Sequence, residues 1–137
     1  MRLSAFPLTE LDPFTEDQLS KIFPEEPDIQ SFWRDAIVQG SKIWVAMFNG
    51  RYLAAAIMGP VNQGTVEISV ITVREVTRKR GVGRFLLEQM EQNALEAKAK
   101  EICILASSED AQQFLNHCGY QEQMQIFRKK LALTTQG

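Results

Sequence analysis

The sequence has little of what marks secreted, membrane-spanning or nucleic-acid-binding proteins. It contains only two cysteines, Cys103 and Cys118, which are too few for a disulfide framework and lack the spacing of metal ligands. No apolar run approaches the roughly 20 residues of a membrane helix, and the first residues lack the apolar core of a signal peptide. The net charge of −2 argues against general nucleic-acid binding. Because free thiols suit a reducing compartment, we expect a cytoplasmic protein.

The overall amino-acid composition is that of an ordinary globular protein. Hydrophobic residues make up 45% of the chain and charged residues 23%. A chain of 137 residues is long enough to bury a hydrophobic core without disulfides. We therefore expect a single domain over residues 1–137, in which residues 131–137 form a frayed tail.

Two helices are expected early in the chain. Thr15 and Gln18 have the spacing of a capping box, which predicts a helix over residues 16–23. Asp28 has the chemistry to cap a second helix, whose apolar residues recur with helical period. Gly40 is expected to end that second helix.

Four strands are expected within the first 73 residues. Residues 3–6 suit a short first strand, and residues 43–48 and 51–58 flank Asn49-Gly50, the strongest short-range hairpin signal. Residues 65–73 form a long apolar run that predicts the next strand.

The rest of the chain continues with helices and strands in alternation. We expect a helix over residues 84–97, a strand over 102–106, a helix over 109–117 and a closing strand or hairpin over 120–131. A strand, a helix and a strand in succession predict a parallel pair with a right-handed crossover. The expected fold is an α/β sandwich with a mixed, mostly antiparallel sheet and helices on both faces.

The connection between the long strand and the following helix carries the clearest functional signal. It reads Arg78-x-x-Gly81-x-Gly83, with cations at residues 78–80. The unpaired amides and positive dipole of the helix start, together with these cations, predict a seat for a phosphate or pyrophosphate. Neither the P-loop nor the dinucleotide-binding pattern fits, since the third glycine position of the latter is Leu86. The alternative is a basic, solvated turn that only caps the helix.

This motif and the order of elements resemble the GNAT acyltransferase superfamily, whose members bind acetyl-CoA. The resemblance implies that Ile71, Thr72 and Val73 line the pantetheine arm of acetyl-CoA or CoA. It further implies that the phosphates are cradled by Thr77, Arg78, Lys79, Arg80, Gly81, Val82, Gly83 and Arg84.

Residues 73–83 are also similar, nearly letter for letter, to the aspartate α-decarboxylase maturation factors, the PanM or PanZ family. Members of that family keep the acetyl-CoA site, bind the decarboxylase zymogen and promote its self-cleavage in pantothenate biosynthesis. The resemblance, together with expected positions in an exposed hairpin and loop, implies that Asn49, Arg51, Arg74 and Glu75 contact this protein partner.

A catalytic acetyltransferase is the second interpretation. GNAT enzymes commonly place a tyrosine acid one residue after a phenylalanine in the last helix, where this chain has Leu115. Tyr120 is expected to be a core aromatic. Glu67 lies where some GNAT enzymes carry a general base; it faces either a cleft or solvent. A third interpretation is a nucleotide- or phosphate-binding module in which no acyl group takes part.

Overall fold

The fold is a mixed sheet with helices on both faces, as predicted. The computed structural model describes residues 3–8, 10–22, 29–74, 81–106, 109–123 and 126–131 of the chain. Its described strands are β1 (Ser4–Leu8), β2 (Lys42–Phe48), β3 (Arg51–Met58), β4 (Thr65–Val73), β5 (Glu101–Leu105), β6 (Gln121–Gln123) and β7 (Ile126–Lys130). Its described helices are α1 (Pro13–Ser20), α2 (Ile29–Val38), α3 (Val82–Glu96) and α4 (Glu109–His117).

The described strands form one sheet in the order β1-β2-β3-β4-β5-β7-β6. Strands β4 and β5, which α3 connects, are parallel, whereas the other neighbouring pairs are antiparallel. This confirms the mixed, mostly antiparallel sheet and its parallel pair. Among the described residues, no helix is long and apolar enough to cross a membrane.

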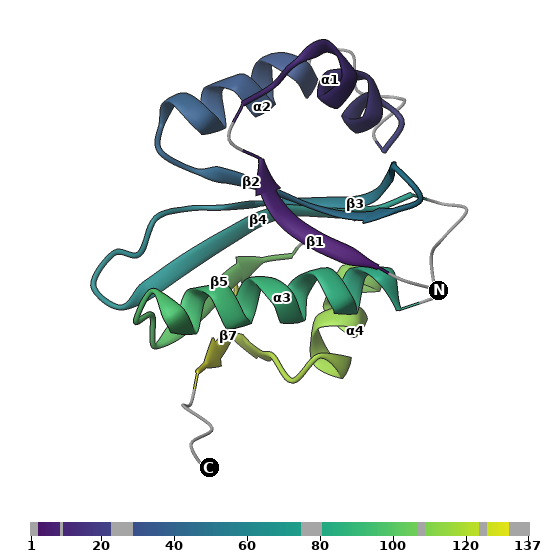
Figure 1. Ribbon diagram of the computed structural model, residues 1–137. Helices are drawn as coiled ribbons and strands as arrows, with labels where there is room; N and C mark the ends of the chain where they lie inside the picture. Colours follow the sequence, from purple (N-terminus) through teal and green to yellow (C-terminus); the bar gives the residue numbers. More distant parts are fainter. Residues whose placement is uncertain are drawn as a thin grey trace.

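The sheet separates two hydrophobic clusters (Figure 1). On one face, buried residues of the strands pack with Leu86 and Met90 of α3 and with Leu115 of α4. On the other face, Leu19 of α1 and Trp33 of α2 pack against β2 and β3. We call these the α3 face and the α1–α2 face. Because α1 and α2 lie over β2 and β3, the side chains that β4 and β5 present on the α1–α2 face remain open to solvent.

The predicted start of the first helix is wrong. Helix α1 begins at Pro13, and its cap is Asp12, whose Oδ1 accepts the backbone N–H of Thr15 at 2.7 Å. This hydrogen bond holds the pKa of the Asp12 carboxyl below its ordinary value. Thr15 and Gln18 are both buried. Gln18 does not close a capping box but reaches β3, where its Oε1 accepts the backbone N–H of Tyr52 at 3.2 Å.

The predicted hairpin is confirmed. Phe48 and Arg51 are paired across a two-residue turn, with Asn49 at φ 53° and Gly50 at φ 74°. Two positive φ values in succession define the type I′ turn that suits the twist of paired strands. The turn leaves Asn49 and Arg51 exposed at the end of the hairpin.

Other element boundaries shift by small amounts. Helix α3 begins at Val82, two residues earlier than predicted, and β5 spans Glu101–Leu105, one residue earlier than predicted. The closing segment is a hairpin, formed by β6 and β7. Asp28, the predicted cap, and residues 132–137, which are most of the predicted tail, lie outside the described residues.

Candidate functional site

Strand β4 extends beyond its parallel neighbour. The pairing of β4 with β5 ends at Ile68 and Ile104, although β4 continues to Val73. No described strand pairs with this edge of β4 over residues 69–72. The edge therefore offers backbone donors and acceptors to an extended ligand, in the way that an edge strand accepts an added strand.

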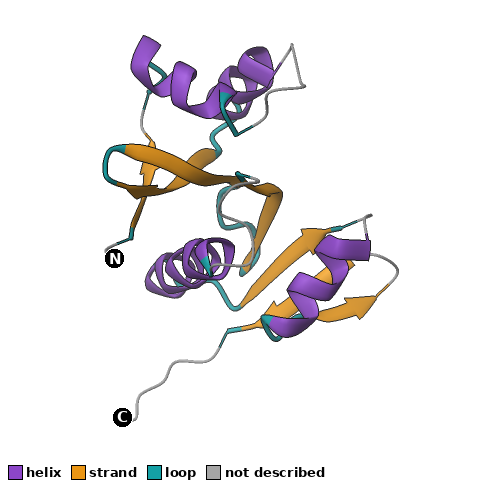
Figure 2. Cartoon of the chain, turned by 90° about the vertical axis from the view of Figure 1, so that its right-hand side faces the viewer, coloured by secondary structure: helices purple, strands orange, loops and turns teal. Residues whose placement is uncertain are grey.

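A β-bulge in β4 opens this edge. Ile57 pairs with Ser69 and Ala55 pairs with Thr72, so β4 has one residue more than β3 opposite Ala56. A bulge bends its strand and increases the local twist. The end-on view shows the strands of the first half of the sheet diverging from β5 and β7 (Figure 2). The bulge thus separates the end of β4 from β5.

The start of α3 lies next to the end of β4. Gly81, at φ 81°, precedes the helix, and the first helical hydrogen bond is donated by the N–H of Phe85 to the carbonyl of Gly81 at 2.9 Å. The N–H groups of Val82, Gly83 and Arg84 come before this bond, and no side chain caps the helix. Backbone donors at the positive end of a helix form a favourable seat for an anion.

Gly83 has a packing role in addition to the one predicted. It is buried inside the first turn of α3, and only Gly81 of the two glycines has a positive φ. A Cβ on Gly83 would lie 3.0 Å from Val73 Cγ2 and 3.3 Å from Phe114 Cζ. The glycine therefore lets β4, α3 and α4 meet closely. Sequence reasoning missed this role of Phe114, because the contact joins residues far apart in the chain.

The remaining predicted coenzyme residues divide into two groups. Ile71, Thr72 and Val73 are half-buried on the part of β4 that extends beyond β5, and Arg84 is exposed on α3. A second group lies outside the described residues and comprises Thr77, Arg78, Lys79 and Arg80. The structure thus brings together the strand edge and the helix start that the prediction requires.

Glu67 lies on the open part of the α1–α2 face. Its side chain is exposed and lines a shallow pocket of about 390 Å³, together with Ser69, Cys103 and Leu105. Cys103 is half-buried. Partial burial raises the pKa of the Cys103 thiol, which disfavours a reactive thiolate.

Neither Leu115 nor Tyr120 supplies an acid to this region. Leu115 is buried in the core at 1% exposure. Tyr120 is buried as predicted, and its hydroxyl donates to Glu91 Oε2 at 2.9 Å. Burial, with the nearby carboxylate of Glu91, raises the pKa of Tyr120 far above its ordinary value. Tyr120 is thus a structural residue.

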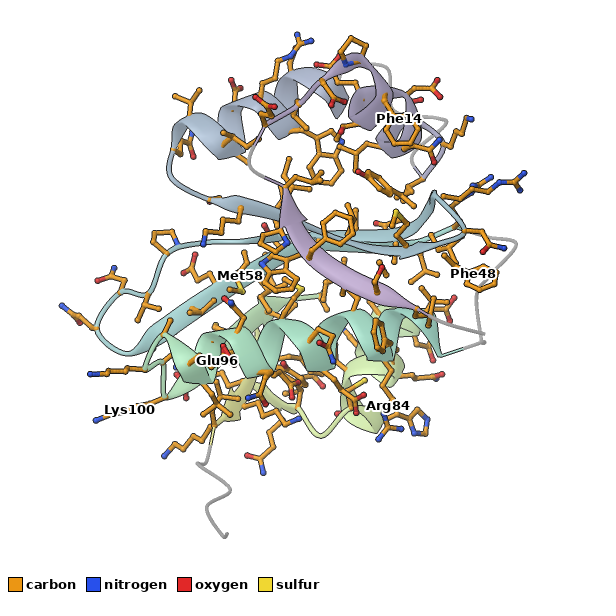
Figure 3. All side chains as sticks on the ribbon, in the orientation of Figure 1. Phe14, Phe48, Met58, Arg84, Glu96 and Lys100 are labelled. Carbon is orange, nitrogen blue, oxygen red and sulfur yellow. The ribbon has the colours of Figure 1, made fainter. Side chains whose placement is uncertain are left out.

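The predicted partner residues lie near the helix start. Figure 3 places Phe48, next to the hairpin turn, and Arg84 of α3 at the same end of the molecule. Asn49 and Arg51 belong to that hairpin end, and Arg74 follows β4 directly. Glu75 lies outside the described residues.

The chain matches the family described as "Acetyltransferase (GNAT) domain, PanZ" over residues 3–128. It belongs to this family. The match confirms the resemblance inferred from the sequence and covers almost every described element of the PanZ-type domain.

Individual relatives agree with this membership. The chain is 35% identical over 72 residues to the PanD regulatory factor of Escherichia coli (strain K12). That match covers 48% of this chain and 56% of the relative, so it spans little more than half of the curated protein.

Solved structures share the fold over nearly the whole chain. The solution structure of Escherichia coli YhhK bound to coenzyme A is 28% identical, with a TM-score of 0.77, and the match covers 96% of this chain and 100% of that one. A GNAT family acetyltransferase from Elizabethkingia anophelis with acetyl-CoA bound has a TM-score of 0.69 at 17% identity, covering 94% of this chain and 98% of that one. The fold is therefore one that binds CoA or acetyl-CoA in related proteins.

Proposed function

We propose that this PanZ-family protein is an acetyl-CoA-dependent regulator that binds the aspartate 1-decarboxylase zymogen and promotes its self-cleavage. The proposal includes a cytoplasmic location and a role in the control of pantothenate and CoA synthesis. Family membership supports the regulatory role, and the E. coli relative, a PanD regulatory factor, points the same way.

One observation carries the coenzyme part of the proposal. The edge of β4 over residues 69–72 leads toward the amides of Val82, Gly83 and Arg84, for which the described residues supply no hydrogen-bond partner. The pantetheine arm contains two amide groups, so it is suited to hydrogen-bond along β4 as an added strand does. The diphosphate would then lie against the helix amides, which follow the cations at residues 78–80 in the sequence. A strand edge followed by helix-start amides therefore matches a ligand with an extended arm that ends in a diphosphate.

The regulatory interpretation is supported by the lack of a suitable acid among the described residues near β4. Leu115 has no proton to donate, and the Tyr120 hydroxyl is bonded to Glu91. General acid catalysis of thiolate departure contributes about 10²–10⁴ in rate. A protein without it is better suited to present acetyl-CoA to a partner than to transfer the acetyl group.

The experiment that tests this function measures self-cleavage of the uncleaved decarboxylase from the same organism. Reactions contain the precursor alone, with this protein, with acetyl-CoA, or with both. We expect faster cleavage only when both are present. The proposal fails if the rate with both equals the rate with the precursor alone, provided that acetyl-CoA binding has been verified by calorimetry.

The pocket beside Glu67 favours one alternative, an acetyltransferase acting on an amine. The carboxylate is exposed on β4, two residues before the unpaired edge begins at Ser69, and it is accessible to an acceptor. If this alternative holds, the protein acetylates at least one amine of a panel, and Glu67→Gln abolishes the transfer while acetyl-CoA affinity is retained. If no amine is acetylated, the alternative is rejected.

A further inference from the structure

Phe14 of α1 is an exposed aromatic residue that is nevertheless held in a fixed position. It is 56% exposed, and its ring makes an edge-to-face contact with Tyr52, with centroids 6.2 Å apart and planes at 78°. Tyr52 is 4% exposed and makes a second edge-to-face contact with Phe6 of β1. Isolated exposed apolar residues are common on proteins. Phe14 differs from such residues because a buried aromatic residue supports its ring.

Helix α1, which carries Phe14, is attached directly to the turn end of the β2–β3 hairpin. Pro13 and the Asp12 cap fix the first turn of α1, in which Phe14 lies. One turn later, Gln18 Oε1 accepts the backbone N–H of Tyr52. Gln18 is only 8% exposed, so this bond is shielded from water. The position of Phe14 relative to the hairpin is therefore set by both a ring contact and a hydrogen bond.

The hairpin end that Phe14 adjoins already carries two of the proposed partner contacts. Arg51 and Asn49 are exposed there. Side chains alternate along β3, so Arg51 and Tyr52 project to opposite faces, and Phe14 and Arg51 flank the hairpin on two sides. Figure 3 shows Phe14, Phe48 and Arg84 at the same end of the molecule, with Glu96 and Lys100 at the other end. A partner bound at this end would contact α1, the hairpin and the coenzyme-binding region together.

We infer that Phe14 is an anchor for the decarboxylase zymogen, which would wrap over the hairpin end from Arg51 to α1. The inference rests on the proposed function and extends its surface to a helix that the sequence did not implicate. A partner segment that is complementary to this surface would place an apolar side chain against the Phe14 ring and a carboxylate against the Arg51 guanidinium. Aromatic and arginine side chains dominate the energetics of protein interfaces. A ring that is already ordered loses little conformational entropy on binding.

The test compares Phe14→Ser with Val38→Ser, a matched control. Val38 is 85% exposed on α2 and is not part of the proposed surface, so both variants remove an exposed apolar side chain from a helix. The rate of zymogen cleavage is measured against regulator concentration at saturating acetyl-CoA. We expect the half-saturating concentration to rise about 30-fold for Phe14→Ser, as for a hot-spot residue, and to stay unchanged for Val38→Ser. Acetyl-CoA affinity, measured by calorimetry, should be equal in all three proteins.

A second variant separates the loss of a contact from the loss of folding. Phe14→Leu keeps an apolar side chain, and its half-saturating concentration should lie between those of the wild type and Phe14→Ser at an unchanged melting temperature. The inference is overturned if both Phe14 variants stay within about twofold of the wild type. It is also overturned if Phe14→Ser changes only the oligomeric state of the free protein, because a second copy then covers the ring. If the wild-type protein itself does not accelerate cleavage, the proposed function fails instead.

Discussion

The backbone N–H of Arg74 donates a hydrogen bond of 2.7 Å to the carbonyl of Leu53. Leu53 is the extra residue of a β-bulge in β3, since Ala46 pairs with Ala54 while Met47 pairs with Tyr52. In keeping with the bulge, Leu53 and Ala54 both pack on the α3 face. The bond thus links the turn end of the β2–β3 hairpin, which carries the proposed partner contacts, to the end of β4.

Removing this hydrogen bond should destabilise the protein more than removing the Arg74 side chain. Arg74→Pro eliminates the donor and leaves the Leu53 carbonyl without it, whereas Arg74→Ala keeps the N–H. We expect Arg74→Pro to lower the free energy of unfolding by about 1–3 kcal/mol, and Arg74→Ala to lower it by less. Urea unfolding of both variants provides the measurement. Equal losses would show that the side chain, rather than the backbone bond, stabilises this region.

The close contact at Gly83 predicts a second, separable effect. In Gly83→Ala, the new methyl group must displace Val73 or Phe114, which lie 3.0 Å and 3.3 Å from the Cβ position. Overpacking of this kind costs about 1–3 kcal/mol, partly offset by the better helix propensity of alanine. Acetyl-CoA affinity should fall as well, since the shifted helix start carries the proposed phosphate donors.

A double-mutant cycle with Phe114→Leu checks the cause. Leucine is smaller than phenylalanine, so it leaves room for the added methyl group. The cost of Gly83→Ala, measured by chemical unfolding, should therefore be smaller in the Phe114→Leu background than in the wild type. Strictly additive costs would mean that the contact with Phe114 is not the source of the destabilisation.

The buried hydroxyl of Tyr120 predicts a dependence of stability on alkaline pH. Because the folded-state pKa of Tyr120 is raised, the folded protein retains a proton that the unfolded chain loses near pH 10. The stabilisation is therefore complete below pH 10 and decreases above it, by up to about 1.4 kcal/mol per pH unit.

Tyr120→Phe isolates this contribution. The wild type should be more stable than the variant by about 1–3 kcal/mol near pH 8, since the hydroxyl donates to the Glu91 carboxylate. That difference should shrink as the pH rises above 10. A difference in unfolding free energy that stays constant between pH 8 and pH 11 would contradict the assignment.

Local patterns in the sequence were sufficient to predict most of the fold. The β2–β3 hairpin follows from Asn49-Gly50, and the bounds of β4 and α4 match the predicted ranges. These elements have signals that lie within a few residues, namely turn chemistry and hydrophobic periodicity. The helix start at which we propose an anion seat was predictable for the same reason, because a strand, glycines and a helix follow one another directly.

Features that depend on distant residues were not predictable in this way. Thr15 and Gln18 match a capping box, but the Gln18 side chain instead accepts a hydrogen bond from the backbone N–H of Tyr52, 34 positions away. The bulges in β3 and β4 depend on the pairing of strands and have no local signature here. Cys103 lies in an apolar run that suggests burial on both faces, yet α1 and α2 leave one face of β5 open. In each case the tertiary arrangement, and not local preference, decides the outcome.

The central claim is that acetyl-CoA binds between the edge of β4 and the amides at the start of α3. The most direct test is an NMR titration that follows backbone amide resonances as acetyl-CoA is added. The account predicts large shift changes at Thr72, Val82 and Gly83, with small changes at Val38 and Lys100. Saturable binding with the largest changes elsewhere, or no binding at all, would contradict it.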